Sequence, residues 1–194
     1  MSSILLCGVG GQGTVLASRI LAQAAMNRGM FARTAETIGM AQRGGCVVSH
    51  VSFGEGVYSS LIPQGSADLI IASEPCEAAR NLGYLKSGGL VVTSPDAIQP
   101  VTASLSGKHF EGAAMIDYLR RHARVLTVDT AELKRRTGSI KGLNIALIGC
   151  ALEAESVGIT PDDVDGAIRQ KVNPRFWDMN RAALLLGREC ARKT

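Results

Sequence analysis

Short apolar runs that end in glycine or a polar residue recur along the chain and predict the strands of a sheet. The first, at residues 4–7, is closed by Gly8 and is typical of a buried parallel strand. Further runs predict strands at residues 30–36, 68–73, 90–93 and 125–129. Apolar residues at helical spacing predict helices between them, at residues 14–28, 75–82 and 112–122. Because strands and helices alternate, the pattern indicates an α/β fold of the doubly wound, Rossmann-like kind.

The segment after the second predicted strand departs from this alternation. Residues 37–45 are too few to hold a crossover helix. Residues 46–53 and 57–62 flank Gly54-Glu55-Gly56 and are predicted to form a β-hairpin with a three-residue loop. The mainly parallel sheet is therefore expected to contain an antiparallel hairpin insertion.

The C-terminal part of the chain is predicted to be helical. A helix starting near Leu143 has apolar residues on two faces, so we expect it to be buried on two sides, by its own domain or by another subunit. Thr160 followed by Pro161 marks the start of the next helix, and a last helix is predicted at residues 175–192. Because no linker, repeat or low-complexity tract appears, residues 1–194 are expected to form a single domain.

The composition is that of a soluble globular protein with an aliphatic core. Hydrophobic residues make up 46% of the chain and charged residues 20%, whereas aromatic residues reach only 4%. So few aromatic residues argue against a platform for stacking single-stranded nucleic acid. The net charge of +4 comes from basic clusters on predicted helices, typical of solvated faces, with an anionic cofactor or an acidic partner as the alternative. No nucleic-acid-binding motif is present, and no apolar run approaches the ~20 residues of a membrane span.

The five cysteines are scattered, with no CxxC or longer cluster pattern, at Cys7, Cys46, Cys76, Cys150 and Cys190. Iron–sulfur and structural zinc sites built from local loops need closely spaced thiolates, so neither is expected on this chain. The histidines likewise have no companions at metal-ligand spacing. An odd number of cysteines without a signal peptide points to the reducing cytoplasm.

A glycine-rich turn joins the first predicted strand to the first predicted helix. Gly8-Val9-Gly10-Gly11-Gln12-Gly13 has the G-x-G-x-x-G spacing, in which glycines permit a tight turn and a close approach of phosphate to bare backbone. The helix then begins at Thr14, and the amides of a helix N-terminus favour an anion. Three interpretations remain open: a dinucleotide site with Glu36 as the ribose acid, a site for another phosphate-bearing ligand, and a purely structural turn. The Gln12 amide can bond neighbouring loops or a ligand, but it is no acid, base or nucleophile.

A second glycine-flanked motif, Met40-Ala41-Gln42-Arg43-Gly44-Gly45, follows the second predicted strand. In a doubly wound sheet this places it at the same carboxyl edge as the first turn. Arg43, between Gln42 and two glycines, can hold a phosphate or a carboxylate in its fork. An arginine that pairs with an acid across an interface is the alternative.

Three further polar residues stand in predicted strands or helices. Glu74 ends a buried strand at the expected ligand edge, but it can also cap the helix that starts at Pro75. Asn144 lies in the two-faced helix and needs hydrogen-bond partners, from a ligand, from backbone or from an interface. His50 is interpreted as a satisfied strand histidine. With no lysine-bearing phosphate loop, nucleophile elbow or acid–base pair in the sequence, no catalytic residue is expected on this chain.

Taken together, these motifs resemble the gamma-type domain of 2-oxoacid:ferredoxin oxidoreductases. The resemblance rests on the G-x-G-G-Q-G form of residues 8–13 and on Gln42-Arg43-Gly44-Gly45 leading into Val47-Val48-Ser49-His50-Val51. It extends over nearly the whole chain, through the strand at residues 68–74 and the helix start Lys141-Gly142-Leu143-Asn144. The run at residues 40–45 resembles the small (beta) subunit of the indolepyruvate enzyme more than the pyruvate or 2-oxoglutarate versions.

The resemblance implies a division of labour between subunits. A large partner would bind thiamine diphosphate and Mg²⁺, decarboxylate a 2-oxoacid such as indolepyruvate or another aryl-pyruvate, and pass electrons through [4Fe–4S] clusters to ferredoxin. The acyl group goes to coenzyme A, whose site this chain would share while holding no cofactor firmly itself. The candidate binding residues are Gly8, Gly10, Gly11, Gln12, Gly13, Thr14, Gln42, Arg43, Gly44, Gly45, Glu74 and Asn144.

Two other functions remain open from the sequence. One is a free-standing NAD(P)-dependent oxidoreductase, which has the glycine turn and Glu36 but no recognisable hydride-transfer residues. The other is a non-catalytic assembly module, which the apolar helices favour. A homodimer of the isolated chain would hide the same apolar surface that a large subunit covers in a complex.

Overall fold

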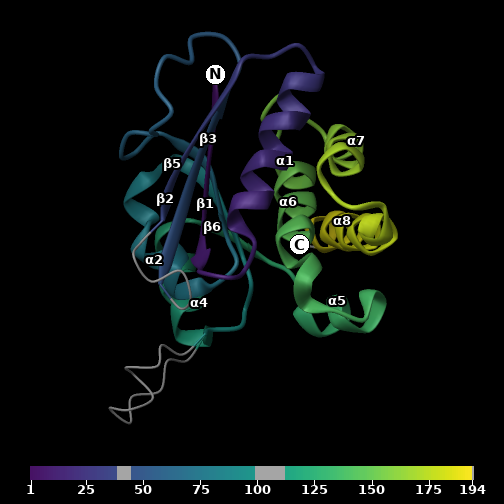
Figure 1. Cartoon of the computed structure of the whole chain (residues 1–194). Coiled ribbons are helices and arrows are strands. Elements are labelled where there is room, and N and C mark those ends of the chain that lie inside the picture. The colour runs from purple at the N-terminus through teal and green to yellow at the C-terminus, as the bar shows by residue number, and fades with distance from the viewer. Residues whose placement is uncertain (39–44, 99–111, 194) are drawn as a thin grey trace.

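The structure, a computed structural model, describes residues 1–38, 45–98 and 112–193. Its centre is a sheet of six strands in the order β2-β3-β1-β4-β5-β6 (Figure 1). The strands are β1 (Ser2–Val9), β2 (Ala32–Ile38), β3 (Cys46–Phe53), β4 (Ala67–Ala72), β5 (Leu85–Thr93) and β6 (Arg124–Thr127). Strands β1, β4, β5 and β6 pair in parallel, whereas β3 is antiparallel to both of its neighbours, β1 and β2. The prediction of a mainly parallel sheet with an antiparallel part is therefore confirmed.

The predicted partner of β3 is wrong. β3 pairs with β2, with Ala32 opposite Phe53 and Thr37 opposite Val48, and residues 57–62 form no strand. Both edges of β3 are already occupied by β1 and β2, so a third strand has no backbone groups left to pair with. Residues 57–62 instead cross one face of β3, where the Ile62 N–H donates a hydrogen bond to His50 Nδ1 at 3.2 Å.

Helices cover both faces of the sheet and divide the core into two clusters. Strand β1 shows the division, because Ile4 and Leu6 pack on one face and Leu5 and Cys7 on the other. The first face carries α1 (Thr14–Asn27), α6 (Leu143–Ala154), α7 (Pro161–Lys171) and α8 (Trp177–Arg192). The second carries α2 (Pro75–Arg80) and α4 (Gly112–His122). In the described part of the chain, no helix is long and apolar enough to cross a membrane.

Helix α6 is buried on all sides by its own chain. Every residue from position 143 to position 152 is buried, between the sheet, α1 and α8. Two glycines allow α6 and α8 to approach closely: a Cβ at Gly149 would lie 2.4 Å from the Leu184 carbonyl oxygen, and one at Gly187 would lie 1.8 Å from the Ala146 carbonyl oxygen. Of the two explanations for a helix with two apolar faces, the structure shows burial by its own domain.

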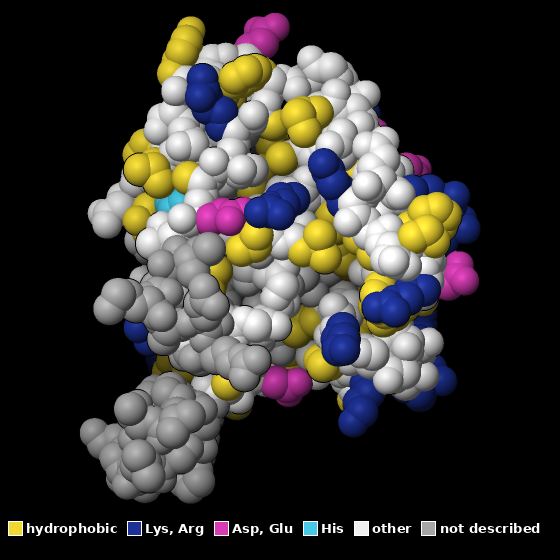
Figure 2. All heavy atoms as spheres, viewed as in Figure 1, with side chains coloured by type: hydrophobic (Ala, Val, Ile, Leu, Met, Phe, Trp, Pro, Cys, Tyr) yellow, Lys and Arg dark blue, Asp and Glu magenta, His cyan; other side chains and the backbone are white. Residues whose placement is uncertain are grey.

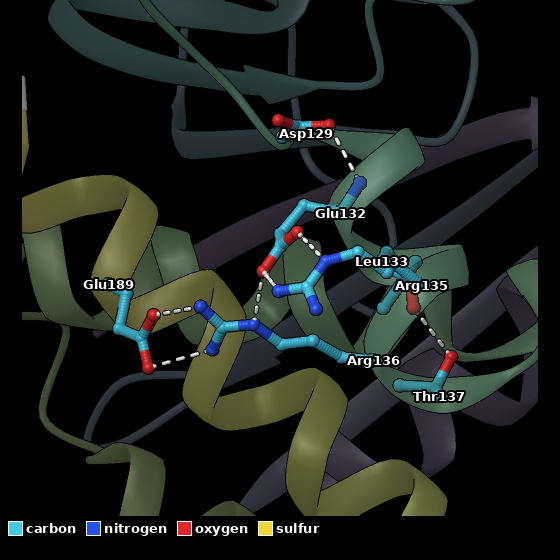
Figure 3. Close-up of polar contacts among 7 residues, drawn as sticks. All are labelled: Asp129, Glu132, Leu133, Arg135, Arg136, Thr137 and Glu189. Carbon is cyan, nitrogen blue, oxygen red and sulfur yellow. Dashed lines mark hydrogen bonds and ion pairs between the residues drawn. The ribbon is translucent and has the colours of Figure 1, made fainter.

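Helix α5 (Thr130–Thr137), whose last turn carries Lys134, Arg135 and Arg136, is tied to α8 by ion pairs (Figure 3). Asp129 caps the helix by accepting a hydrogen bond from the Glu132 N–H at 2.9 Å. The Glu132 carboxylate accepts hydrogen bonds from Arg135 and Arg136, which lower its pKa to about 2. Arg136 also reaches Glu189 on α8 at 2.8 Å. Much of this positive charge is thus paired with acids of the same chain. Three short 3₁₀ turns complete the structure, at Leu82–Tyr84, Ile140–Gly142 and Pro174–Phe176.

Candidate functional site

The glycine turn lies at the carboxyl end of β1, where the chain passes into α1. Gly11 and Gly13 have φ angles of +99° and +83°, a left-handed conformation that side chains other than glycine rarely adopt. Gly13 is also the N-terminal cap of α1, so the turn delivers the chain directly into the helix. The predicted connection of strand, glycine turn and helix is confirmed.

The Gln12 side chain holds the turn against the neighbouring strand. Its Oε1 accepts hydrogen bonds from the Val9 N–H at 2.6 Å and from the Ser73 hydroxyl at 2.9 Å. Its Nε2 donates to the Ser73 carbonyl oxygen at 3.2 Å. Gly8 leaves the space for this contact, because a Cβ there would lie 2.1 Å from Ser73 Oγ. The amide of Gln12 is therefore committed to protein atoms and shapes the site without pointing into it.

Two distant segments complete the turn. Asn144, at the start of α6, donates from Nδ2 to the Gln12 carbonyl oxygen at 2.5 Å. The Gly10 N–H donates to the Gly45 carbonyl oxygen at 2.8 Å, which brings the end of the second glycine motif beside the first. Asn144 thus bonds backbone, one of the possibilities left open by the sequence. The other predicted residues of that motif, Gln42, Arg43 and Gly44, lie outside the described residues.

The N-terminus of α1 opens into a hollow of about 390 Å³, which lies in the size range of small-ligand sites. Its lining consists of Val9, Gly10, Gly11, Gly13, Thr14, Val15 and Val47. No side chain within the described ranges caps this helix, and its first turn, residues 14–17, contains no acid. The hydroxyl of Thr14 is buried and has no hydrogen-bond partner among the described residues. A buried hydroxyl without a partner is costly unless a ligand satisfies it, and an uncapped helix start attracts an anion.

Glu74 is not part of this hollow. It is buried on the α2 side, where its carboxylate accepts hydrogen bonds from the Glu77 N–H at 2.8 Å and the Ile98 N–H at 3.3 Å. It is the N-terminal cap of α2, so the capping role suggested beside the ligand role is the one the structure shows. The structure therefore groups the residues from Gly8 to Thr14 with Gly45 and Asn144, and leaves Glu74 apart.

Glu36 does not occupy the position of a dinucleotide-binding acid. It lies on β2, and β3 stands between β2 and the glycine-turn strand β1. Its carboxylate lies beneath α1, 3.4 Å from the Ser18 hydroxyl and 3.9 Å from Arg19 Nε. In the dinucleotide fold the ribose acid ends the strand beside the glycine turn. The arrangement therefore gives no support to the alternative of an NAD(P)-dependent oxidoreductase.

Ser73 is the residue of this site that the sequence interpretation missed. It follows β4, which pairs with β1, and its hydroxyl and carbonyl oxygen are the anchors for Gln12. The sequence contained a signal for Ser73, because it is a polar residue directly after a buried strand. Such a residue lies at the carboxyl edge of the sheet, where the glycine turn also lies. Which partner it takes is visible only once β4 is placed next to β1.

Three cysteines lie near the acids of α2, and none has the character of a nucleophile. Burial, helped by Glu77, raises the pKa of the Cys46 thiol to about 11, and burial with Glu74 raises that of Cys76 to about 12. Burial also raises the pKa of Cys7 well above its usual value. All three thiols are therefore protonated at neutral pH. Within the described ranges, no group of three or more potential ligands is arranged to hold a metal ion.

Comparison with known proteins places this geometry in a family. The model of the pyruvate ferredoxin/flavodoxin oxidoreductase family matches residues 3–190. The sequence is 34% identical to indolepyruvate oxidoreductase subunit IorB of Pyrococcus horikoshii, over 98% of this chain and 96% of that protein. The fold matches the keto/oxoacid ferredoxin oxidoreductase gamma subunit of Geobacter sulfurreducens with a TM-score of 0.73, at 23% identity over all of both chains. It also matches the 2-oxoglutarate:ferredoxin oxidoreductase of Magnetococcus marinus, with a TM-score of 0.74 at 18% identity. That structure was solved with 2-oxoglutarate, coenzyme A and succinyl-CoA bound, and the match covers all of this chain and 31% of that one.

The chain belongs to the pyruvate ferredoxin/flavodoxin oxidoreductase family. Its full-length similarity to an IorB subunit confirms the prediction of a small, gamma-type subunit of a 2-oxoacid:ferredoxin oxidoreductase of the indolepyruvate kind. It is thus one subunit of an oxidoreductase complex. The two solved structures are less than 25% identical to it and establish the fold alone.

Proposed function

We propose that this chain supplies part of the coenzyme A site of its enzyme, with the glycine turn and the start of α1 receiving the phosphates. The observation that carries the proposal is the N-terminus of α1, which opens into the hollow beside the hydroxyl of Thr14. In the described part of the chain, no side chain caps this helix and nothing hydrogen-bonds that hydroxyl. Coenzyme A bound to the Magnetococcus marinus enzyme supports the choice of ligand. Residues 1–194 act here as one gamma-type domain.

The residues of the turn divide into those that shape it and those that meet the ligand. Gln12, Ser73 and Asn144 use their side chains on protein atoms and keep the backbone of the turn in place. Gly11 and Gly13 leave the backbone bare, so that a phosphate can approach the amides. Thr14 adds a buried hydroxyl, which donates to a phosphate oxygen once its side chain turns toward the ligand. A turn fixed in advance loses little entropy when the ligand binds.

The chemistry lies on the partner. Thiamine diphosphate, Mg²⁺ and [4Fe–4S] clusters are assigned to the large subunit, where a 2-oxoacid of the indolepyruvate or aryl-pyruvate type is decarboxylated and electrons leave for ferredoxin. The thiol of coenzyme A accepts the acyl group. The contribution of this chain is to hold the phosphate end of coenzyme A so that its thiol is presented to the partner, an effect of proximity and orientation. The odd number of cysteines in the sequence supports a location in the reducing cytoplasm.

Replacing Thr14 tests the proposal. Thr14→Val removes the hydroxyl at nearly constant volume, and we expect it to weaken coenzyme A binding by roughly tenfold, the effect of losing one hydrogen bond to a charged group. Thr14→Ser keeps the hydroxyl and is the matched control, with affinity near that of the unchanged enzyme. Binding is measured by calorimetric titration of coenzyme A into the assembled enzyme in the absence of 2-oxoacid. Equal affinities for the valine and serine variants would remove the α1 N-terminus from the coenzyme A site.

A further inference from the structure

Strand β2 is a free edge of the sheet. Its seven residues pair with β3 in unbroken antiparallel register, and nothing in the described part of the chain pairs with its outer side. It contains no proline, and no bulge interrupts it. Natural proteins usually protect an exposed edge by such devices or cover it, because its N–H and C=O groups are ready to pair with another strand.

Exposed apolar side chains flank this edge on both faces of the sheet (Figure 2). On one face lies α1, whose contact with β2 is marked by Arg19 and Glu36, and Met26 of this helix is 48% exposed. The other face is crossed by residues 57–62, from which Tyr58 and Leu61 stand 90% and 57% exposed. Exposed apolar side chains gathered beside an edge strand are typical of protein contact surfaces.

An aromatic hollow lies where β2 begins. Phe31, the residue before the strand, is 56% exposed and lines the same hollow as Tyr58. The Arg33 guanidinium lies over the Phe31 ring, 5.0 Å from its centre. Exposed tyrosine, phenylalanine and arginine side chains are the types enriched at protein–protein interfaces.

The strand is complementary to a second copy of itself. A two-fold axis perpendicular to the sheet at Ala35 would pair all seven residues of β2 with those of the second copy. Arg33 would then face Thr37 of the second copy, and Thr34 would face its Glu36, so that no like charges oppose each other. The small side chain of Ala35 would meet its own equivalent on the axis. A second copy also brings its own α1 and its own residues 57–62 beside its β2, and these can cover the apolar groups on both faces. A lone peptide strand would leave these groups exposed.

We propose that two copies of this chain pair through β2 and form one continuous sheet across a two-fold axis. The two β2 strands run antiparallel, so the carboxyl edges of the two sheets point in opposite directions. Both glycine turns, which follow β1, then lie away from the contact, and each carboxyl edge stays open to a large subunit. The inference rests on the β2 edge alone and does not depend on the coenzyme A proposal.

Cysteine crosslinking tests both the contact and its register. Ala35→Cys places two thiols opposite each other on the axis, and mild oxidation is expected to give a covalent dimer on a non-reducing gel. Thr34→Cys, one residue away, faces Glu36 of the second copy and is the matched control that remains uncrosslinked, as does the unchanged chain with its five cysteines. Crosslinking through Thr34→Cys in place of Ala35→Cys would overturn the proposed register.

Light scattering after gel filtration measures the association itself. The full chain, of 20.4 kDa, is expected to elute at twice this mass at tens of micromolar. Ala35→Lys sets two ammonium groups against each other on the axis and is expected to raise the dissociation constant at least about tenfold. Gln64→Lys adds the same charge at an exposed position away from β2 and is expected to leave the dimer intact. A folded but monomeric unchanged chain would overturn the proposal.

Discussion

Gln12 and Thr14 are two residues apart in the glycine turn, and their side chains differ in hydrogen bonding. Both polar atoms of the Gln12 side chain form hydrogen bonds with Val9 or Ser73, so Gln12 stabilises the turn. Thr14 lines the hollow and is more deeply buried than Gln12, and its buried hydroxyl has no hydrogen-bond partner among the described residues. Residue type does not separate the two, since both are uncharged and polar. Their surroundings do, because Val9 and Ser73 lie within hydrogen-bonding distance of the Gln12 amide. For this reason the proposal assigns the ligand contact to Thr14.

His50 is expected to make stability depend on pH. Burial lowers its pKa below the ordinary value of 6.5, and its Nδ1 accepts a hydrogen bond from the Ile62 N–H, which requires an unprotonated nitrogen. As the pH falls below about 6.5, the unfolded chain takes up a proton before the folded one does. The free energy of unfolding therefore decreases from that pH downward, and above it His50 makes no pH-dependent contribution.

Urea unfolding between pH 5 and pH 8 checks this expectation. His50→Asn keeps a short acceptor near the Ile62 N–H without a titrating group, so its stability is expected to fall less between pH 6.5 and pH 5 than that of the unchanged chain. His122→Asn, at the exposed end of α4, serves as the control. Parallel pH curves for the unchanged chain and His50→Asn would show that His50 does not cause the dependence.

At the scale of elements, the contact between α6 and α8 depends on glycine. Gly187→Ala would bring a Cβ to 1.8 Å from the Ala146 carbonyl oxygen and 2.8 Å from the Cys150 nitrogen, both backbone atoms of α6 that cannot move aside cheaply. We expect the helices to separate and the free energy of unfolding to fall by about 1–3 kcal/mol or more. The cost follows from close packing, since Gly187 has no left-handed backbone angle.

The matched control is Gly166→Ala in α7. No atom lies within 4 Å of the Cβ that it would add, and its backbone is helical. Alanine is expected to stabilise the chain there by roughly 0.5–1 kcal/mol, because glycine loses more backbone entropy on folding. Urea denaturation of the two variants separates the effects. A Gly187→Ala chain as stable as the Gly166→Ala chain would mean that α6 and α8 are not as closely packed as described.

At the scale of the whole molecule, the carboxyl edge of the sheet carries the glycine turn and the hollow, which form the proposed coenzyme A site. We proposed that thiamine diphosphate, Mg²⁺ and the Fe–S clusters are bound by the large subunit. On that proposal, this edge of the chain must face the large subunit. An affinity-tagged copy captured anaerobically from its native extract is expected to bring down one large subunit with bound thiamine diphosphate and the broad visible absorption of Fe–S clusters. A lone colourless chain that NAD(P)H stabilises would contradict the subunit assignment.

Local patterns in the sequence determined much of this protein. The alternation of apolar strands and amphipathic helices, the glycine turn between β1 and α1 and the caps of α2 and α7 are set by neighbouring residues, so each could be predicted. The family resemblance rested on the same local motifs and is confirmed.

Only the tertiary structure decided which distant segments meet. It paired β3 with β2 where the sequence predicted residues 57–62, and it buried both apolar faces of α6 within one chain. It also joined Gln12 to Ser73 and Asn144, which are 61 and 132 residues away, and set Glu74 and Glu36 apart from the hollow. These outcomes depend on strand order and on competition for shared partners. Such contacts form between segments far apart in the chain, and a local pattern carries no information about them.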